Sequence, residues 1–264
     1  MSTIDVMAPA TVHHEIVMGT VVSFDIRAPA APEATVRAAI EAAVSWLHYV
    51  DHTFSTYRPD SEVNRFDRGE LAARDCSEDL RHVIGLCHRL GRATGGFFDA
   101  WAGGRFDPSG VVKGWSIERA SEILTGMGLT DHLVNGGGDL RLRGRPAPGQ
   151  AWQVGIRHPL AKNAFSAALC LGEGAVATSG TYERGLHILD PRSGKPANEL
   201  ASVTVVGPDL TTADAYATAA FVMGADAPGW LEALSGYEAM LVTPQGRGWW
   251  TPGFKDLEIS TVTS

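Results

Sequence analysis

The chain has 264 residues, of which 44% are hydrophobic and 20% are charged, a composition ordinary for a globular protein with a sizeable core. Its net charge is −8 and its 22 basic residues are scattered, which argues against a nucleic-acid-binding protein. The three cysteines, Cys76, Cys87 and Cys170, form no CxxC pair, so neither a disulfide framework nor a zinc site is indicated.

The N-terminal segment has no sign of export or membrane insertion. Residues 1–17 lack a basic region, an apolar stretch and a lipidation cysteine, so we expect a cytoplasmic protein. No run of 18 apolar residues occurs, so we expect no membrane insertion. We expect residues 1–14 to be flexible and residues 1–264 to form one domain.

The first half of the chain starts with residues that favour β structure. After them, most apolar residues recur at the spacing of a helix. Residues 15–28 favour β structure, with a bend expected at Gly19. Ser77 is placed to cap a helix. Apolar residues recur at helical spacing over the stretches 33–50, 77–92 and 114–127.

The second half has short strand candidates separated by Gly, Pro and Asn turns. These candidates cover residues 133–144, 151–159, 164–172, 175–180, 187–191 and 201–207, with terminal strands around 238–244 and 248–254. A helix is predicted over 211–224, and a short one near 228–235. Because helices come early, strands in the middle and one main helix late, we expect an α+β fold rather than a doubly wound sheet.

An acid and a hydroxyl lie four residues apart in the helix predicted over 211–224. Asp214 and Thr218 therefore share one helix face, with Cβ atoms about 5–6 Å apart. Their oxygens suit a hard cation such as Mg²⁺. In the structural alternative, Thr211 or Thr212 caps the helix, Asp214 favours its N-terminal dipole and Thr218 bonds a carbonyl one turn back. Spacing alone favours this alternative.

A lysine follows a glycine-containing turn that is predicted to lead into a helix. The turn holds Asp107, Gly110 and Lys113. Backbone N–H groups at a helix N-terminus favour anions, and a lysine adds to that preference. The stretch is not a P-loop, because Gly114 follows the lysine where Ser or Thr is required. An ordinary turn and cap would have the same pattern, so both interpretations stay open.

Two later segments combine glycines, acids and a histidine. Residues 134–144 are glycine-rich but lack GxGxxG and precede a strand pattern, so the glycines favour a tight bend or a close backbone contact over a dinucleotide site. Residues 178–196 hold His187 near Asp190, and a histidine near an acid can transfer protons at neutral pH. A lone histidine in a strand is more often structural.

Nine segments, taken in order, resemble the ApbE family of FAD:protein FMN transferases. They are MGT (18–20), FSTYRPDSEVNRF (54–66), TGGFFD (94–99), DPSGVVKG (107–114), NGGGD (135–139), W-V-GI-P (152–159), ATSGTYER (177–184), HILDPRSGKP (187–196) and ADAYATAAFVMG (213–224). Each is short, but nine in the family's order are hard to reach by chance. The resemblance implies a T-fold-like α+β domain with mixed or antiparallel sheets, packed helices and an active site in a cleft between two lobes.

The resemblance also implies roles for individual residues. Asp214, Thr218 and the carbonyl of Gly110 match the family's magnesium ligands, with Mn²⁺ as an alternative metal. His187 matches a histidine implicated in catalysis. The positions that match flavin-nucleotide contacts are Met18, Tyr57, Phe97, Phe98, Asp99, Asp107, Lys113 and Ile188.

The sequence departs from the family's pattern in two places. The turn before Lys113 usually reads DLGGIAKG and here reads DPSGVVKG. The segment between Asp99 and Asp107 is shorter than usual, so an insertion that often helps to wall the flavin pocket is missing.

The activity implied by the resemblance is Mg²⁺-dependent FMN transfer. Such a transferase attaches FMN from FAD through a phosphoester to a Thr or Ser of a target flavoprotein and releases AMP. The alternatives are an FAD pyrophosphatase, in which water attacks instead, and a non-catalytic FAD-binding protein. Retention of His187 beside the Asp214–Thr218 pair favours chemistry, because a binder needs no base. A monomer or homodimer is expected.

Overall fold

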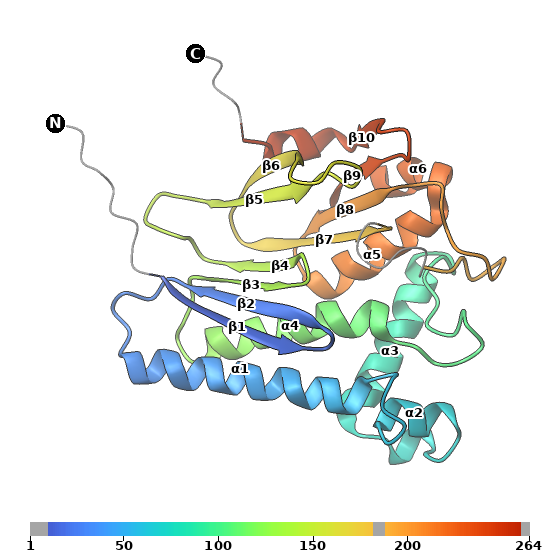
Figure 1. The fold of residues 1–264 in the computed structure, drawn as a ribbon, viewed down its shortest axis with the longest axis horizontal. Helices are drawn as coiled ribbons and strands as arrows, with labels where there is room; N and C mark the ends of the chain where they lie inside the picture. The colour runs from blue at the N-terminus through green and yellow to red at the C-terminus, as the bar shows by residue number, and fades with distance from the viewer. Residues whose placement is uncertain (1–9, 182–187, 260–264) are drawn as a thin grey trace.

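Figure 1 shows the computed structural model of the protein, which describes residues 10–181 and 188–259. Within these residues, eight strands form one antiparallel sheet in the order β1-β2-β3-β4-β7-β8-β9-β10, and β5 pairs with β6 alone. The strands are β1 (Thr11–Val17), β2 (Thr20–Ile26), β3 (His132–Gly136), β4 (Asp139–Arg143), β5 (Trp152–Arg157), β6 (Phe165–Leu171), β7 (Gly174–Gly180), β8 (Ser202–Gly207), β9 (Glu238–Val242) and β10 (Gly248–Trp250).

Helices cover one face of the large sheet, and the β5–β6 ribbon covers part of the other. The helices are α1 (Glu33–Phe54), α2 (Glu62–Asp67), α3 (Glu78–Ala93), α4 (Ser109–Gly126), α5 (Leu210–Met223) and α6 (Ala227–Glu232). Short 3₁₀ turns occupy Ala73–Asp75, Gly224–Asp226 and Pro252–Leu257. Helices α4 and α5 pack directly on the sheet, and α1 packs on α4 (Figure 1). The predicted α+β class with antiparallel sheets is confirmed.

Alternation along the strands separates the two faces of the sheet. In β4, Leu140 and Leu142 join the hydrophobic cluster made with β5 and β6. In β7, Val176 joins that cluster, whereas Ala175 and Ala177 belong to the larger core under the helices. Since neighbouring side chains point to opposite faces, the polar residues that alternate with these leucines face α4 and α5.

The chain starts with a hairpin where a β-rich stretch and a bend were predicted. Met18 and Gly19 form its two-residue turn with positive φ angles of 54° and 69°. This is the geometry of a type I′ turn, in which glycine is favoured. Residues 11–14 belong to β1, so the prediction that residues 1–14 are flexible is wrong for this part.

Two helix starts test the predicted capping residues. Ser77 caps α3, because its Oγ accepts a hydrogen bond from the Leu80 amide, as predicted. In α5 the cap is Asp209, whose Oδ1 accepts from the Thr212 amide at 2.8 Å, so the alternative that Thr211 or Thr212 caps this helix is wrong.

Helix α4 begins earlier than predicted, at Ser109 rather than residue 114. The amides of Val111 and Val112 both donate to the carbonyl of Pro108, which lies just before the helix. Gly110 and Lys113 therefore lie in the helix itself and not in a preceding turn.

The remaining predicted strand, residues 187–191, is reduced to an isolated bridge between Leu189 and Pro196 in its described part.

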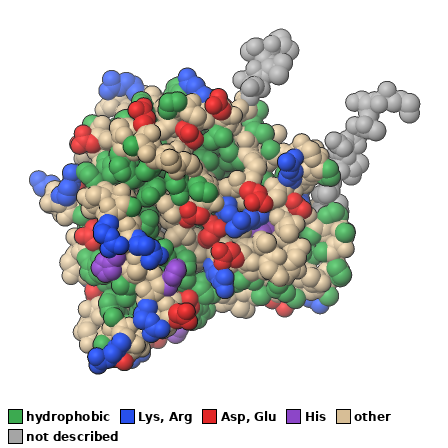
Figure 2. Space-filling view, turned by 180° about the vertical axis from the view of Figure 1, so that it is seen from behind, with side chains coloured by type: hydrophobic (Ala, Val, Ile, Leu, Met, Phe, Trp, Pro, Cys, Tyr) green, Lys and Arg blue, Asp and Glu red, His purple; other side chains and the backbone are tan. Residues whose placement is uncertain are grey.

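Acidic and basic side chains are intermixed on the face shown in Figure 2, in keeping with the scattered basic residues of the sequence. Among the described helices, none combines the length and apolar character needed to cross a bilayer.

Candidate functional site

Helices α4 and α5 approach each other most tightly at Gly114. A Cβ atom on Gly114 would lie 2.7 Å from the carbonyl oxygen of Leu210 and 3.0 Å from the Cβ of Asp214, too close for any larger residue. The Gly114 amide donates to Asp214 Oδ2 at 3.1 Å. In a regular helix the amide of residue 114 donates a hydrogen bond to the carbonyl four residues earlier, which is that of Gly110. The Gly110 carbonyl and the Asp214 carboxyl thus lie beside the same donor.

Lys113 lies between two buried carboxyl groups. Its Nζ is 2.5 Å from Asp139 Oδ2 and 3.7 Å from Asp214 Oδ1. The Asp139 side chain, at the start of β4, is 1% exposed, and its Oδ1 accepts from the Thr178 amide of β7 at 3.0 Å. Three elements, α4, α5 and β4, therefore bring their charges to one buried point.

Burial governs the ionisation of Asp214. It raises the pKa of this carboxyl to about 7; the Lys113 charge opposes the rise and the Asp139 carboxylate adds to it. Burial and a neighbouring acid both disfavour the ionised form of a carboxyl, so a further positive charge nearby would strongly favour that form.

A hydroxyl pair lies one helical turn beyond Asp214. Thr218 Oγ1 is 3.1 Å from Oγ of Ser179, which lies on β7. Ser179 follows the alternation of Ala175 and Ala177 and so faces the helices. Together with the Asp214 carboxyl and the Gly110 carbonyl, the Thr218 hydroxyl forms a set of oxygen donors, with Ser179 beside it.

This donor set suits a hard cation. Mg²⁺ prefers oxygen ligands, takes few of them from the protein and keeps water or substrate oxygens in its remaining positions. Among the described residues no three His, Cys, Asp or Glu side chains gather closely enough to form a metal cluster, so a site of the zinc type is not indicated.

Three of the predicted flavin contacts lie against α4 or against the helical core. Phe98 is 4% exposed and packs on Gly110, whose added Cβ would be 3.0 Å from the ring. The half-buried Met18 approaches α4, where the Ser116 hydroxyl lies 3.7 Å from its sulfur. Ile188 packs against the helical core.

Phe97 and Asp107 each have a contact that the sequence pattern did not suggest. The guanidinium of Arg192 lies 4.0 Å from the centroid of the Phe97 ring, a cation–π arrangement. Asp107 Oδ1 accepts from the amide of Ser109, the first residue of α4, at 3.1 Å.

Three predicted site residues lie apart from this cluster or outside the description. Tyr57 is 94% exposed, and Asp99 is exposed with its Oδ1 accepting from the Trp101 amide. His187 lies outside the described residues, so its role stays a prediction.

The short segment between Asp99 and Asp107 is filled by aromatic packing. Trp101 stacks on His88 with ring centroids 4.8 Å apart and contacts Phe106 at 4.7 Å. Phe106 meets Phe66 edge to face, which ties the segment to α2. The short loop is therefore packed against α3 and α2 through its aromatic rings.

Sequence reasoning missed three residues of the site, although each lies in a motif that it quoted. Asp139 closes NGGGD, Ser179 lies in ATSGTYER and Gly114 follows the lysine of DPSGVVKG. The glycines of NGGGD do form a tight bend and a close contact, as predicted. Gly137 and Gly138 have positive φ angles, and a Cβ on Gly136 would be 2.4 Å from the Ile117 side chain.

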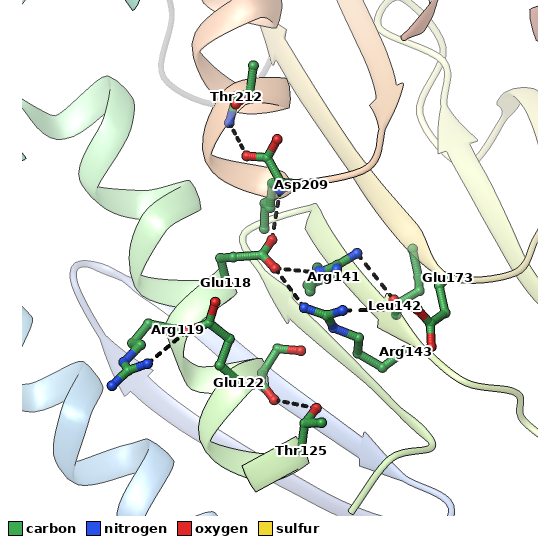
Figure 3. A network of polar contacts seen from close by, with 12 residues as sticks. Glu118, Arg119, Glu122, Thr125, Arg141, Leu142, Arg143, Glu173, Asp209 and Thr212 are labelled. Atoms are coloured by element: carbon green, nitrogen blue, oxygen red, sulfur yellow. Dashed lines mark hydrogen bonds and ion pairs between the residues drawn. The ribbon is translucent and has the colours of Figure 1, made fainter. Parts of the chain in front are cut away.

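A separate ion-pair network fixes the start of α5 (Figure 3). Glu118 of α4 accepts from Arg141 Nε at 2.8 Å and from Arg143 at 3.1 Å, while its Oε2 accepts from the Leu210 amide at 2.8 Å. Leu210 begins α5, so the network holds this helix one turn before Asp214. Because Arg141 is 3% exposed, the contact is a buried anchor rather than a surface pair.

Comparison with known proteins identifies the relatives of the chain. The ApbE family matches residues 18–106 and 100–241. The FAD:protein FMN transferase of Salmonella typhimurium is 25% identical over 307 residues, covering 91% of this chain and 86% of that protein. That of Escherichia coli K12 is 30% identical over 58% of this chain and 48% of that protein.

Solved structures share the fold. The ApbE protein of Thermotoga maritima superposes with a TM-score of 0.84 at 24% identity, over 95% of this chain and all of that chain. The flavin transferase ApbE of Vibrio cholerae gives a TM-score of 0.79 at 25% identity, over 94% of this chain and all of that chain. The resemblance seen in the nine sequence segments is confirmed, and the chain belongs to the ApbE family.

Proposed function

We propose that the chain is a Mg²⁺-dependent FAD:protein FMN transferase, which moves FMN to a Thr or Ser of a target flavoprotein and releases AMP. The observation that carries the proposal is the buried convergence of Lys113 with Asp139 and Asp214 beside the Thr218–Ser179 hydroxyl pair. The family of the chain supports the proposal, because several relatives in the ApbE family are named FAD:protein FMN transferase.

The proposed reaction is a phosphoryl-type transfer. FAD consists of FMN and AMP joined by a pyrophosphate. The oxygen of the acceptor hydroxyl forms a bond to the FMN phosphorus, and the bond from that phosphorus to the bridging oxygen breaks. AMP leaves with the bridging oxygen, and the hydroxyl proton passes to a base. Such a step depends on in-line positioning and charge neutralisation more than on covalent help from the protein.

Lys113 and the oxygen donors supply the charge balance. Asp214, Thr218 and the carbonyl of Gly110 would hold the cation, and Mg²⁺ or Mn²⁺ bound there would neutralise phosphate charge. Lys113 adds a second positive group, which binds phosphate as a point charge. His187 is the proposed base, a role that typically contributes ~10²–10⁴ in rate.

The residues around α4 are the proposed contacts to the flavin nucleotide. Phe98 and Met18 line the helix that carries Lys113 and Gly110. The exposed ring of Tyr57 is available for stacking. The full set of proposed contacts remains Met18, Tyr57, Phe97, Phe98, Asp99, Asp107, Lys113 and Ile188.

One incubation separates this activity from the two alternatives. The chain is mixed with FAD, Mg²⁺ and an acceptor protein that carries a Thr, and intact mass and AMP are measured. Covalent FMN on the acceptor together with AMP supports the transferase. Free FMN and AMP without an adduct indicate a pyrophosphatase, and unchanged FAD indicates a binding protein.

A further inference from the structure

The aspartate that ends NGGGD is placed to act on Lys113. Asp139 Oδ2 is the nearer of the two carboxyl partners of the lysine, at 2.5 Å against 3.7 Å for Asp214. Its other oxygen accepts from the Thr178 amide, which fixes the orientation of the carboxyl. The position itself is set by the hairpin of β3 and β4, whose register pairs Gly136 with Asp139.

We propose that Asp139 is a positioning residue that holds the Lys113 ammonium away from Asp214, so that Asp214 stays available to a cation. The inference rests on the proposed function, since it concerns the same site. An ammonium and a divalent cation compete for one carboxylate, because each is repelled by the other at short range. A second buried carboxylate, closer to the lysine than Asp214 is, resolves this competition.

Burial does not force Lys113 into its contact with Asp139. A buried carboxylate needs a partner, but Lys113 is 32% exposed and could reach solvent without Asp139. With Asp139 as its nearer partner, the ammonium stays charged and at the site of the phosphates, while the Asp214 carboxylate is left to the cation.

A double-mutant cycle on Mn²⁺ binding tests the proposal. The single variants are Asp139→Asn, which retains an oxygen acceptor for Thr178, and Lys113→Met, which retains the apolar stem. Mn²⁺ alone is titrated into each variant and into the double variant, and bound metal is measured by electron paramagnetic resonance. Thermal melting checks folding, and Asp139→Ser replaces Asp139→Asn if the latter does not fold.

We expect Asp139→Asn to weaken Mn²⁺ binding about tenfold, the effect of losing one charge-assisted contact. In the Lys113→Met background the same substitution should change the affinity less than about threefold, because no ammonium is left to compete. Equal losses in both backgrounds, or no loss in either, would overturn the proposal.

A matched control uses another aspartate paired with a basic side chain. Asp25, on β2, accepts from Arg27 Nε at 2.6 Å, and Asp25→Asn should leave Mn²⁺ affinity unchanged. Wild-type protein that binds no Mn²⁺ and forms no FMN adduct overturns this inference and the proposed function together. Wild-type protein that does both, combined with an additive cycle, overturns this inference alone.

Discussion

At the scale of single residues, the sequence pointed to two of the oxygens that we propose to bind the cation, and the structure adds the residues around them. The spacing of Asp214 and Thr218 indicated two oxygens on one helix face. It could not indicate Asp139 or Ser179, because these reach the same point from strands distant in sequence. The Gly114–Asp214 hydrogen bond, for example, joins residues 100 positions apart.

The substitution Asp214→Asn tests the central ligand. The amide keeps the shape of the side chain and an oxygen that can accept from Gly114, so the fold should remain. The negative charge is lost, and we expect FMN transfer to fall by about a hundredfold or more at limiting Mg²⁺. Transfer is followed by in-gel fluorescence and folding by thermal melting. Wild-type transfer at limiting Mg²⁺ would remove Asp214 from the ligand set.

His132 gives a prediction for the pH dependence of stability. It is fully buried, with Nδ1 2.8 Å from the Leu129 carbonyl and Nε2 2.7 Å from the Ser121 hydroxyl. A carbonyl only accepts, so Nδ1 carries the proton and Nε2 accepts from Ser121. Burial lowers the pKa of His132 from 6.5 to about 4; the hydrogen bond to the Leu129 carbonyl opposes this shift, and the charges of Arg143 and Arg141 contribute to it.

Proton binding to His132 should make the protein less stable as the pH falls. Between pH 6.5 and 4 the unfolded chain binds a proton at this histidine and the folded chain does not, so the stability it contributes is present above pH 6.5 and is lost as the pH falls. The loss should be on the order of 3 kcal/mol at most. Urea unfolding at several pH values measures it, and His132→Gln should flatten this part of the profile. An equally steep fall in that variant contradicts the assignment.

At the scale of elements, the sequence predicted the helices that have one apolar face. It did not predict where these helices begin and end. The stretches 33–50 and 77–92 became α1 and α3 with small shifts at their ends. Helix α2 was missed because six residues provide too few turns for a periodic pattern. Helix α4 was placed too late, since Pro108 and Gly110 are typical of turns although proline is also tolerated at helix starts.

Gly114 tests the contact between α4 and α5. We expect Gly114→Ala to destabilise the protein by about 1–3 kcal/mol, because the added Cβ would overlap the Leu210 carbonyl. The displaced helix should also weaken FMN transfer. Gly126→Ala on the same helix is the matched control: its Cβ meets no atom within 4 Å, so stability should stay equal or rise by up to about 1 kcal/mol. Equal effects of the two substitutions would contradict the close-contact interpretation.

At the scale of the whole molecule, the strand order carries the information that the sequence could not give. Strand β7 pairs with β4, and the intervening β5–β6 ribbon leaves the large sheet altogether. This arrangement places Ser179 of β7 beside the hairpin that carries Asp139, with α4 and α5 above both. Local pattern predicts strands but not their partners, so Asp139 and Ser179 could be placed at the site only from the fold.

Ligand binding should stabilise the whole molecule. If FAD and Mg²⁺ bind only the folded chain, a concentration of 100 times Kd adds about 2.7 kcal/mol to the free energy of unfolding. Thermal melting with FAD, with Mg²⁺ and with both should show the largest increase for the pair, because the cation and the pyrophosphate neutralise each other. NAD should give a smaller increase, since no GxGxxG turn is present. A larger increase with NAD than with FAD contradicts a flavin-nucleotide site.

The most direct test of the proposed FMN transfer is the intact mass of an acceptor protein after incubation with this chain, FAD and Mg²⁺. We expect one FMN attached per acceptor, one AMP released per FMN, and no adduct when the acceptor Thr is replaced by Val. We also expect loss of the adduct with Asp214→Asn while that variant stays folded. AMP release without any adduct on the intact acceptor would contradict the transferase and leave a hydrolase in its place.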